Sequence, residues 1–281
     1  MESKKLEVRY LSDKERSRSQ ALYEEIFVED ADGFSELYYQ IKARDNQILV
    51  AEEDGAIVSM LHRNPYTFEF RGTKVRADYI VAVATKAAYR HQGRMRRLLT
   101  KALGDMYADG LPFTFLMPAD EAIYTPFDFR LMGNDDEESL ADLAPDELAE
   151  DYDLFVKKDE AYQRRHIDWP EWESTPMMVR LVDLARFVAP IGAEKPQSLT
   201  LRVADPILPE NDGVFCWSFT EEGSSLTRSD AEPELVISIA DLGSFLFGML
   251  GAEELPGIRE AAIRKLMQVR VVNGVYLNEL V

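Results

Sequence analysis

The segment Asp78–Ala84, which reads DYIVAVA, constrains the fold more than any other part of the chain. Almost every residue in it is apolar, which indicates a strand that is covered on both faces. Apolar residues between Met95 and Met106 then recur at helical spacing, and Phe113–Met117 reads as another strand. Because strand, helix and strand follow one another, we expect a crossover unit whose two strands run parallel or nearly so.

Upstream of this unit the chain reads as mixed α and β structure. Ser12 is expected to cap a helix that runs to about Phe27. Two apolar runs on either side of Asp54-Gly55 predict a tight hairpin, since this pair of residues tolerates the left-handed backbone of such turns. Gly72-Thr73 predicts a further turn of the same meander.

The loop between the central strand and the helix carries the clearest chemical signal. It opens an amphipathic helix, so free backbone N–H groups and the positive end of the helix dipole converge there. Arg90, Arg94, Arg96 and Arg97 add positive charge to this region in a chain whose net charge is −19. The pattern predicts a phosphate-binding site, although a basic helix on an α/β domain without a ligand is the alternative. The glycine frameworks of nucleoside triphosphate and dinucleotide sites are absent from the sequence.

Charge and composition narrow the classes of partner. A net charge of −19 argues against general affinity for nucleic acid or anionic membrane surfaces, and it suits a cationic substrate. The first ten residues lack the apolar core of a signal peptide, and no stretch approaches the roughly 18 apolar residues of a membrane span. We therefore expect a cytoplasmic protein that binds neither nucleic acid nor membrane.

The sequence contains no metal-binding motif, and its single cysteine is not expected to be reactive. The three histidines, His62, His91 and His166, are scattered and lack the spacing of zinc motifs, so no metal is expected. The single cysteine, Cys216, lies in the apolar run Val214–Trp217 and is expected to be a core thiol on a buried strand.

A second unit is expected after an acidic stretch. Residues 134–153 contain ten acidic residues and no basic one, and they fit either a solvated linker or a docking site for a basic partner. Trp169-Pro170-Glu171-Trp172 marks the entry to the second unit. Strand-like runs follow at Met178–Val182, Ser198–Val203, Val214–Phe219 and Leu235–Ile239, and helical patterns at Ala240–Leu250 and Ile258–Met267.

The basic loop gives the chain a recognisable family resemblance. Arg90-His91-Gln92-Gly93-Arg94-Met95 resembles the pyrophosphate loop Arg/Gln-x-x-Gly-x-Gly/Ala of the GNAT acetyltransferases. Met95 replaces the usual small residue, which is similar to the branch typified by the enhanced-intracellular-survival (Eis) acetyltransferases. The resemblance implies that acetyl-CoA is the cofactor. The residues that it assigns to cofactor binding are Val83, Thr85, His91, Gln92, Gly93, Arg94, Met95 and Arg96.

Two catalytic groups follow from the same resemblance. The segment from Pro118 to Phe129 is similar to the one in which Eis-like proteins carry a tyrosine that protonates the departing CoA thiolate, which makes Tyr124 the candidate acid. Packing against neighbouring phenylalanines is the alternative role for this side chain. The closing sequence NELV resembles Eis-type chains, whose terminal carboxylate reaches the active site, so the α-carboxylate of Val281 is the candidate base. A solvated terminus is the alternative.

The resemblance also implies the architecture. The fold class is α/β (α+β), with a GNAT acyltransferase domain on a central mixed sheet at residues 1–155, including the acidic linker at 134–153, and a smaller sterol-carrier-protein-like domain at 170–281. Full-length Eis-like chains carry a second acetyltransferase-like domain between these units, and the linker cannot replace it, so the chain resembles a shortened form.

The function that this implies is transfer of an acetyl group from acetyl-CoA to a primary amine. A non-catalytic acyl-CoA-binding or regulatory module is the alternative, in which the second domain binds a partner or an apolar ligand. The identity of the amine and the question of a homo-oligomer stay open at this point.

Overall fold

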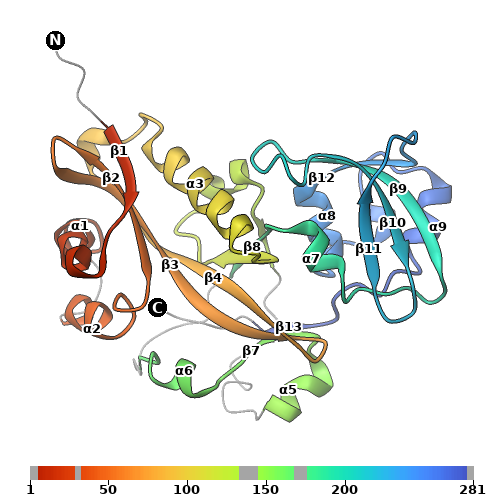
Figure 1. Cartoon of the computed structure of the whole chain (residues 1–281), viewed down its shortest axis with the longest axis horizontal. Helices are drawn as coiled ribbons and strands as arrows, with labels where there is room; N and C mark the ends of the chain where they lie inside the picture. The colour runs from red at the N-terminus through yellow and green to blue at the C-terminus, as the bar shows by residue number, and fades with distance from the viewer. Residues whose placement is uncertain (1–5, 29–32, 133–144, 168–175, 277–281) are drawn as a thin grey trace.

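A computed structural model describes residues 6–28, 33–132, 145–167 and 176–276 of the chain. These residues form two lobes, each built on one sheet, with the four-stranded sheet at the opposite end of the molecule from α1 and α2 (Figure 1). The acidic residues up to 144, the Trp169–Trp172 junction and Val281 lie outside the described residues, and so do the predictions that fall on them.

The first lobe contains a nine-stranded sheet among the described residues. Its main path runs β1-β2-β3-β4-β5-β8-β6, and β7 pairs with the far half of β3 and with β13. The strands are β1 (Leu6–Tyr10), β2 (Gln47–Glu53), β3 (Ala56–Phe70), β4 (Thr73–Thr85), β5 (Phe113–Leu116), β6 (Arg130–Leu131), β7 (Leu154–Val156), β8 (Met178–Leu181) and β13 (Val275–Tyr276).

Two tight hairpins give this sheet its long antiparallel centre. Asp54 and Gly55 have φ values of 53° and 82°, which confirms the predicted turn between β2 and β3. Arg71 and Gly72 have φ values of 47° and 76° and join β3 to β4. The turn predicted at Gly72-Thr73 is therefore one residue too late. Glycine was expected at the first position of the turn, but Arg71 occupies it in the left-handed conformation.

The crossover unit is confirmed. β4 and β5 are parallel, with Asp78 opposite Thr114 and Tyr79 opposite Phe115, and α3 (Arg94–Ala108) connects them. The apolar stripe of α3 is fully buried, because helical spacing places these side chains on the face that meets the sheet. Its members are Leu98, Leu99, Ala102, Leu103 and Met106.

Helices cover both faces of the first sheet. Arg63 of β3 bonds to Asp109 just beyond α3, whereas the preceding residue, His62, bonds to Tyr38 of α2. Successive strand residues point to opposite faces, so α3 and α2 lie on different sides of the sheet. The helix expected after Ser12 begins as a 3₁₀ helix, η1 (Asp13–Ser19), and continues as α1 (Gln20–Ile26), followed by α2 (Phe34–Ile41).

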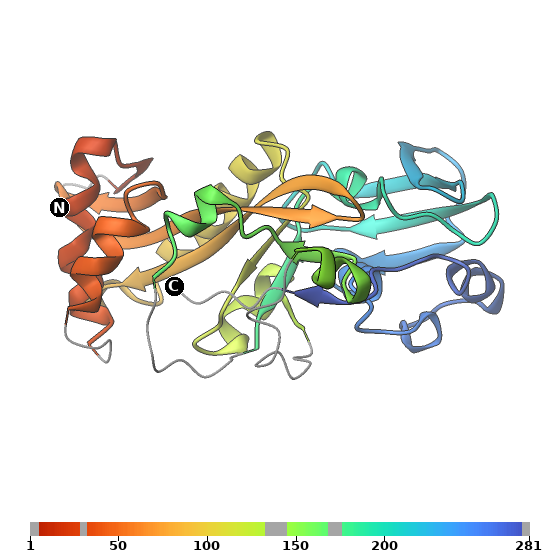
Figure 2. The same ribbon diagram turned by 90° about the horizontal axis from the view of Figure 1, so that it is seen from below.

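The tip of the β3–β4 hairpin contacts the second lobe. Figure 2 shows the β3–β4 hairpin reaching toward that lobe, and Arg71 at its tip donates hydrogen bonds to the carbonyl oxygens of Pro190, Arg270 and Val271 at 3.1, 2.8 and 2.9 Å. The remaining short elements of the first lobe are η2 (Ala87–Tyr89), α4 (Glu121–Tyr124), η3 (Thr125–Phe127), α5 (Pro145–Asp151) and α6 (Glu160–Gln163).

The second lobe is a four-stranded sheet in the order β11-β10-β9-β12 with helices packed on it. Its core contains Trp217, Phe219 and Phe245, all less than 5% exposed. The elements are α7 (Leu184–Val188), β9 (Gln197–Ala204), β10 (Gly213–Phe219), β11 (Ser224–Arg228), β12 (Leu235–Ser238), α8 (Ile239–Leu246), η5 (Ala252–Glu254) and α9 (Glu260–Leu266).

Two details of this region differ from the sequence interpretation. The strand at 178–181 pairs with β5 and β6 of the first sheet, although it was assigned to the second unit. Its apolar pattern identifies a strand but contains no information about its partner. Cys216 is only half-buried, because Phe215 and Trp217 point into the core and the alternation of β10 turns Cys216 to the other face.

Candidate functional site

The central strands part at the carboxyl end of β4. Pairing between β4 and β5 ends at Tyr79 and Phe115, while β4 continues to Thr85. Across the part of the chain that the structure describes, β4 has no strand partner on this side beyond Tyr79. The opening exposes backbone groups of the sheet beside the start of α3, which is the position of the basic loop.

The loop has a strongly curved backbone. His91 and Gly93 have φ values of 58° and 75°, and Gly93 is the residue that precedes α3. The first intrahelical bond runs from the N–H of Arg97 to the carbonyl of Gly93, so the N–H groups of Gly93 to Arg96 have no partner within the helix. Among the described residues no side chain caps this helix, and a β-carbon built on Gly93 would meet no atom within 4 Å. The donors and the open space before them fit a pyrophosphate group.

The side chains of Arg94 and Gln92 form hydrogen bonds that stabilise the loop. Arg94 is 8% exposed; its guanidinium lies 3.1 Å from the Glu53 carboxylate and donates to Gln92 Oε1 at 2.6 Å. Gln92 in turn donates to the carbonyl oxygen of Ala88 at 3.0 Å. Because the charge of Arg94 is paired with Glu53, only its backbone N–H is available to an anion.

The other loop cations face outward. Arg96 is exposed, and its guanidinium lies 4.9 Å from the centre of the Phe127 ring. His91 and Arg97 are also exposed, whereas Met95 is half-buried against the core. The larger residue at position 95 therefore adds packing under the loop and leaves the space in front of the helix open.

A bulge distorts β4 where it lines the opening. Met60 pairs with Ala84 and His62 with Val81, so Leu61 faces two residues of β4, and Ala82 has a φ of 53°. An extra residue in one strand leaves backbone groups outside the regular ladder. Val83 is half-buried beside the bulge, and the Thr85 hydroxyl lies 2.7 Å from the Ser59 hydroxyl. The Thr85 side chain is thus directed across the sheet to β3.

Tyr124 lies at the end of α4, three residues before Phe127, whose ring contacts Arg96 of α3. It is 6% exposed, and its ring meets that of Phe129 edge to face at 6.1 Å between centroids. Burial raises the pKa of Tyr124 to about 12. The described residues provide no hydrogen-bond partner for its hydroxyl, so Tyr124 holds a proton at neutral pH that it can donate.

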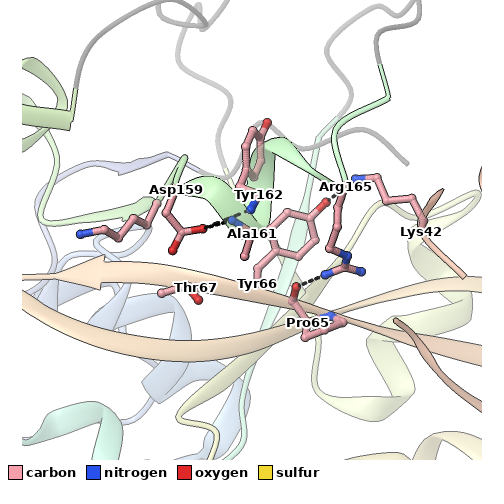
Figure 3. A pocket seen from close by; sticks show the side chains of 9 residues that line it. Lys42, Pro65, Tyr66, Thr67, Asp159, Ala161, Tyr162 and Arg165 are labelled. Carbon is pink, nitrogen blue, oxygen red and sulfur yellow. Dashed lines mark hydrogen bonds between the residues drawn. The ribbon is translucent and has the colours of Figure 1, made fainter. Parts of the chain in front are cut away.

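A pocket on the α2 face adjoins the place where β4 and β5 part. Figure 3 shows Tyr66 in its wall, with Lys42 and Arg165 at one end and Asp159 at the other. The Tyr66 ring packs against Tyr79 and Phe115, the last paired residues of the two strands. Asp159 caps α6 by accepting the backbone N–H groups of Ala161 and Tyr162 (Figure 3). The pocket is therefore next to the opening of the sheet, on the face opposite α3.

Beside this pocket lies a buried polar chain that the sequence did not reveal. Arg165 donates to the Asn46 amide oxygen at 2.9 Å, and the Asn46 amide donates to the Tyr38 hydroxyl at 3.1 Å. The Tyr38 oxygen lies 2.7 Å from Nδ1 of His62. Burial lowers the pKa of His62 to about 3, so the ring is neutral and shares one hydrogen bond with the Tyr38 hydroxyl, whose direction depends on the tautomer of the ring. The sequence gave no signal of this chain of bonds, because its residues lie on α2, just before β2, on β3 and after α6.

The structure thus places Val83 and Thr85 at the end of β4, residues 91–96 at the start of α3 and Tyr124 at the end of α4, and Val281 lies outside the described residues. In the described ranges no group of three or more His, Cys, Asp or Glu side chains is placed to hold a metal ion. Among the helices that the structure describes, none is both long and apolar enough to cross a membrane.

Comparison with protein families places two domains on the chain. Residues 7–132 match the acetyltransferase (GNAT) domain, and residues 184–265 match the sterol carrier protein domain. No curated protein matches the sequence significantly.

Solved structures resemble the whole chain. A protein of unknown function from Enterococcus faecalis, titled a probable N-acyltransferase, aligns with 97% of this chain and 100% of its own at a TM-score of 0.78 and 13% identity. A GCN5-related N-acetyltransferase from Kribbella flavida aligns with 99% of both chains at a TM-score of 0.74 and 16% identity. Eis1 from Mycobacterium abscessus aligns with 97% of this chain and 99% of its own at a TM-score of 0.72 and 13% identity. At such identities the likeness concerns the fold.

Proposed function

We propose that this chain, in which residues 7–132 match the GNAT acetyltransferase domain and residues 184–265 match the sterol carrier protein domain, transfers an acetyl group from acetyl-CoA to a primary amine. The observation that carries the proposal is the left-handed loop at His91 and Gly93, which opens α3 beside the gap between β4 and β5. It combines an anion site with a strand whose backbone is open to a ligand. Both are needed to bind and orient a long cofactor that ends in a thioester.

The cofactor is held mainly by backbone. The N–H groups of Arg94, Met95 and Arg96 receive the pyrophosphate, and Gly93 leaves room for it because it has no side chain. Exposed Arg96 and His91 lie beside the same groups. Val83 and Thr85 flank the opening along β4, where a pantetheine arm can bond to strand backbone.

Acetyl-CoA supplies an activated acetyl group when it is bound. The bulge at Ala82 provides backbone N–H groups outside the ladder, and such donors stabilise negative charge that develops on a carbonyl oxygen. Tyr124 keeps its proton on the phenolic oxygen up to about pH 12, because burial disfavours the phenolate, and it donates this proton to the departing sulfur.

Val281 is the proposed base through its α-carboxylate. β13 runs parallel to β7, which is antiparallel to β3, so β13 and β4 share one direction toward the opening. Tyr276 pairs with Phe155 of β7, Phe155 pairs with Glu69 of β3, and Glu69 pairs with Lys74 of β4. Tyr276 therefore lies at the same height in the sheet as Lys74. Five extended residues span at most about 17 Å, which is enough to reach the level of Tyr79, where the strands part.

The acceptor is an amine that arrives as a cation. A net charge of −19 attracts such a molecule, which must lose a proton before it attacks. We propose that it enters by the Tyr66 pocket, because this pocket adjoins the opening from the face opposite α3. A cytoplasmic location remains the expected one.

Two measurements test the proposed function. Calorimetry with CoA should give saturable binding, and a free-thiol assay should give amine-dependent release of CoA from acetyl-CoA. The panel should include polyamines, aminoglycosides, lysine side chains and peptide amino termini. Binding of CoA without thiol release from any of these amines would instead indicate a non-catalytic acyl-CoA-binding module.

A further inference from the structure

Arg180 is a fully buried cation, and it lies where the two lobes meet. Its side chain is 0% exposed, although it belongs to β8 of the first sheet. Three hydrogen bonds leave its guanidinium group, to the Phe127 carbonyl at 2.8 Å, the Leu181 carbonyl at 2.5 Å and Asp205 Oδ1 at 2.8 Å. A planar guanidinium can serve three directions at once, which an ammonium group cannot reproduce in the same geometry.

On one side Arg180 is tied to the second lobe. Asp205 follows β9 and is fully buried, with an exposed side-chain fraction of 0%. Its carboxylate also accepts the backbone N–H groups of Ile207 and Leu208 at 3.0 and 2.9 Å and the Asn211 amide at 3.1 Å. With these contacts the carboxylate cannot follow a displaced arginine, so the second lobe fixes where Arg180 lies.

On the other side Arg180 holds the turn that carries Tyr124. Phe127 ends η3, which begins directly after Tyr124, and Asp128 closes the turn with a φ of 64° and an N–H bond to the Thr125 carbonyl. The Asp128 carboxylate lies 3.9 Å from the same guanidinium group. Arg180 therefore fixes the end of the short element whose first turn positions Tyr124.

Phe127 also connects this turn to the cofactor loop. Its ring lies under the exposed guanidinium of Arg96, 4.9 Å away, while its carbonyl oxygen is held by Arg180. Phe127 thus contacts the start of α3 with its side chain, and with its backbone it contacts Arg180, which lies between the two lobes. A shift of the Phe127 backbone would displace Tyr124 and the cofactor helix relative to each other.

We propose that Arg180 is a positioning residue for acetyl transfer, through which the sterol carrier protein domain fixes the Tyr124 turn against the cofactor loop. This inference rests on the proposed acid role of Tyr124. It makes the second domain a structural part of the acetyltransferase site, in addition to any ligand that the domain binds itself.

Arg180→Lys and Asp205→Asn test the proposal against Arg202→Lys. Arg202 belongs to the second lobe and pairs with Asp212 at 2.9 Å, with a third of its side chain exposed, so it controls for loss of an arginine–aspartate pair. A displacement of about 1 Å costs on the order of 100-fold in rate. We expect kcat to fall at least about tenfold in both test variants, with less than about threefold change in the KM for acetyl-CoA, and little change in Arg202→Lys.

A double-mutant cycle with Tyr124→Phe separates positioning from general loss of stability. If Arg180 acts through Tyr124, Arg180→Lys should cause no further loss of kcat in the Tyr124→Phe background. If the loss of kcat in the double variant equals the product of the two single losses, Arg180 acts elsewhere and the proposal is overturned. So would a folded Arg180→Lys protein whose kcat lies within twofold of the wild type.

Hydrogen exchange gives a reading that does not depend on activity. The amides of Ile123 and Asp128, which bond to the carbonyls of Asp120 and Thr125, should exchange faster in Arg180→Lys than in Arg202→Lys. Unchanged exchange at both amides would refute the positioning role even if acetyl transfer is demonstrated. Faster exchange in a protein that acetylates no amine would support the structural link and would reject the proposed enzyme function instead.

Discussion

The two sides of the site are built in different ways. The proposed cofactor side comes from one continuous stretch, residues 83–96, and offers mainly backbone N–H groups at the start of α3. The proposed acid side is a short turn at Tyr124, which Arg180 and, through it, Asp205 of the other lobe hold in place. The first side depends on local geometry, and the second depends on contacts between segments that are distant in the chain. Substitutions should therefore affect them through different observables.

The largest effect is expected at Gly93. Gly93→Asp forces a side chain onto a φ of 75° and places a carboxylate before the free N–H groups, so CoA binding should be lost in calorimetry. Gly72→Asp is the matched control, because Gly72 has a φ of 76° and equally open surroundings but lies in a hairpin. Wild-type CoA affinity in Gly93→Asp would exclude the loop as the pyrophosphate site.

The next effect concerns the proposed base. Adding two glycines after Val281 moves the carboxylate without deleting a side chain, and kcat should fall by roughly 100-fold, as expected for a displaced general base. The melting temperature should change little, because extended terminal residues are usually tolerated. A control extension before Met1 should leave kcat unchanged. Full activity in the C-terminally extended protein would leave Glu121 or a water molecule as the next candidate base.

Two arginines of the cofactor loop should respond in opposite ways. Arg96→Ala removes an exposed cation beside the N–H groups and should weaken CoA binding about tenfold, the usual worth of one charge-assisted contact. Arg94→Ala leaves Glu53 buried without its partner and should lower the free energy of unfolding by about 3 kcal/mol. Its CoA affinity should change little. Equal losses of affinity in both variants would mean that the Arg94 side chain contacts the cofactor.

A pH dependence of stability is expected at His62. Burial depresses the pKa of this histidine from 6.5 to about 3 in the folded protein. Its contribution to stability is therefore complete above pH 6.5 and is lost as the pH falls toward 3, by about 1.4 kcal/mol per pH unit. Denaturant unfolding between pH 6.5 and 4.5 should show a slope steeper by this amount in the wild type than in His62→Phe.

The cofactor side was largely predictable from the sequence. The apolar strand, the glycine before the helix and the stripe of α3 are local patterns, and the structure confirms the parallel strands and the helix between them. The side-chain roles within the loop were not predictable. Arg94 and Arg96 look alike in sequence, but only the fold shows that Glu53 neutralises the first and that the second lies over Phe127.

The acid side was predictable only in part. Tyr124 was found by resemblance, whereas its support by Arg180 was missed, because β8 was assigned to the second unit and a buried arginine has no local signature. The same reason applies to Tyr38, Asn46 and His62, which meet only in the folded chain. Contacts over such sequence distances follow from sheet order, which periodicity does not encode.

The central claim is that the cofactor loop and the Tyr124 turn form one acetyltransferase site. The most direct test of it is the Tyr124→Phe variant, measured for both CoA affinity and turnover. The account predicts that the dissociation constant for CoA is unchanged and that kcat falls by about 100-fold, because one buried proton donor is lost while the backbone anion site is intact. Wild-type kcat should also show no loss attributable to Tyr124 until the pH nears 12, well above the value of 10 for free tyrosine. Wild-type turnover in the Tyr124→Phe protein would contradict the account and return Tyr124 to a packing role against Phe129.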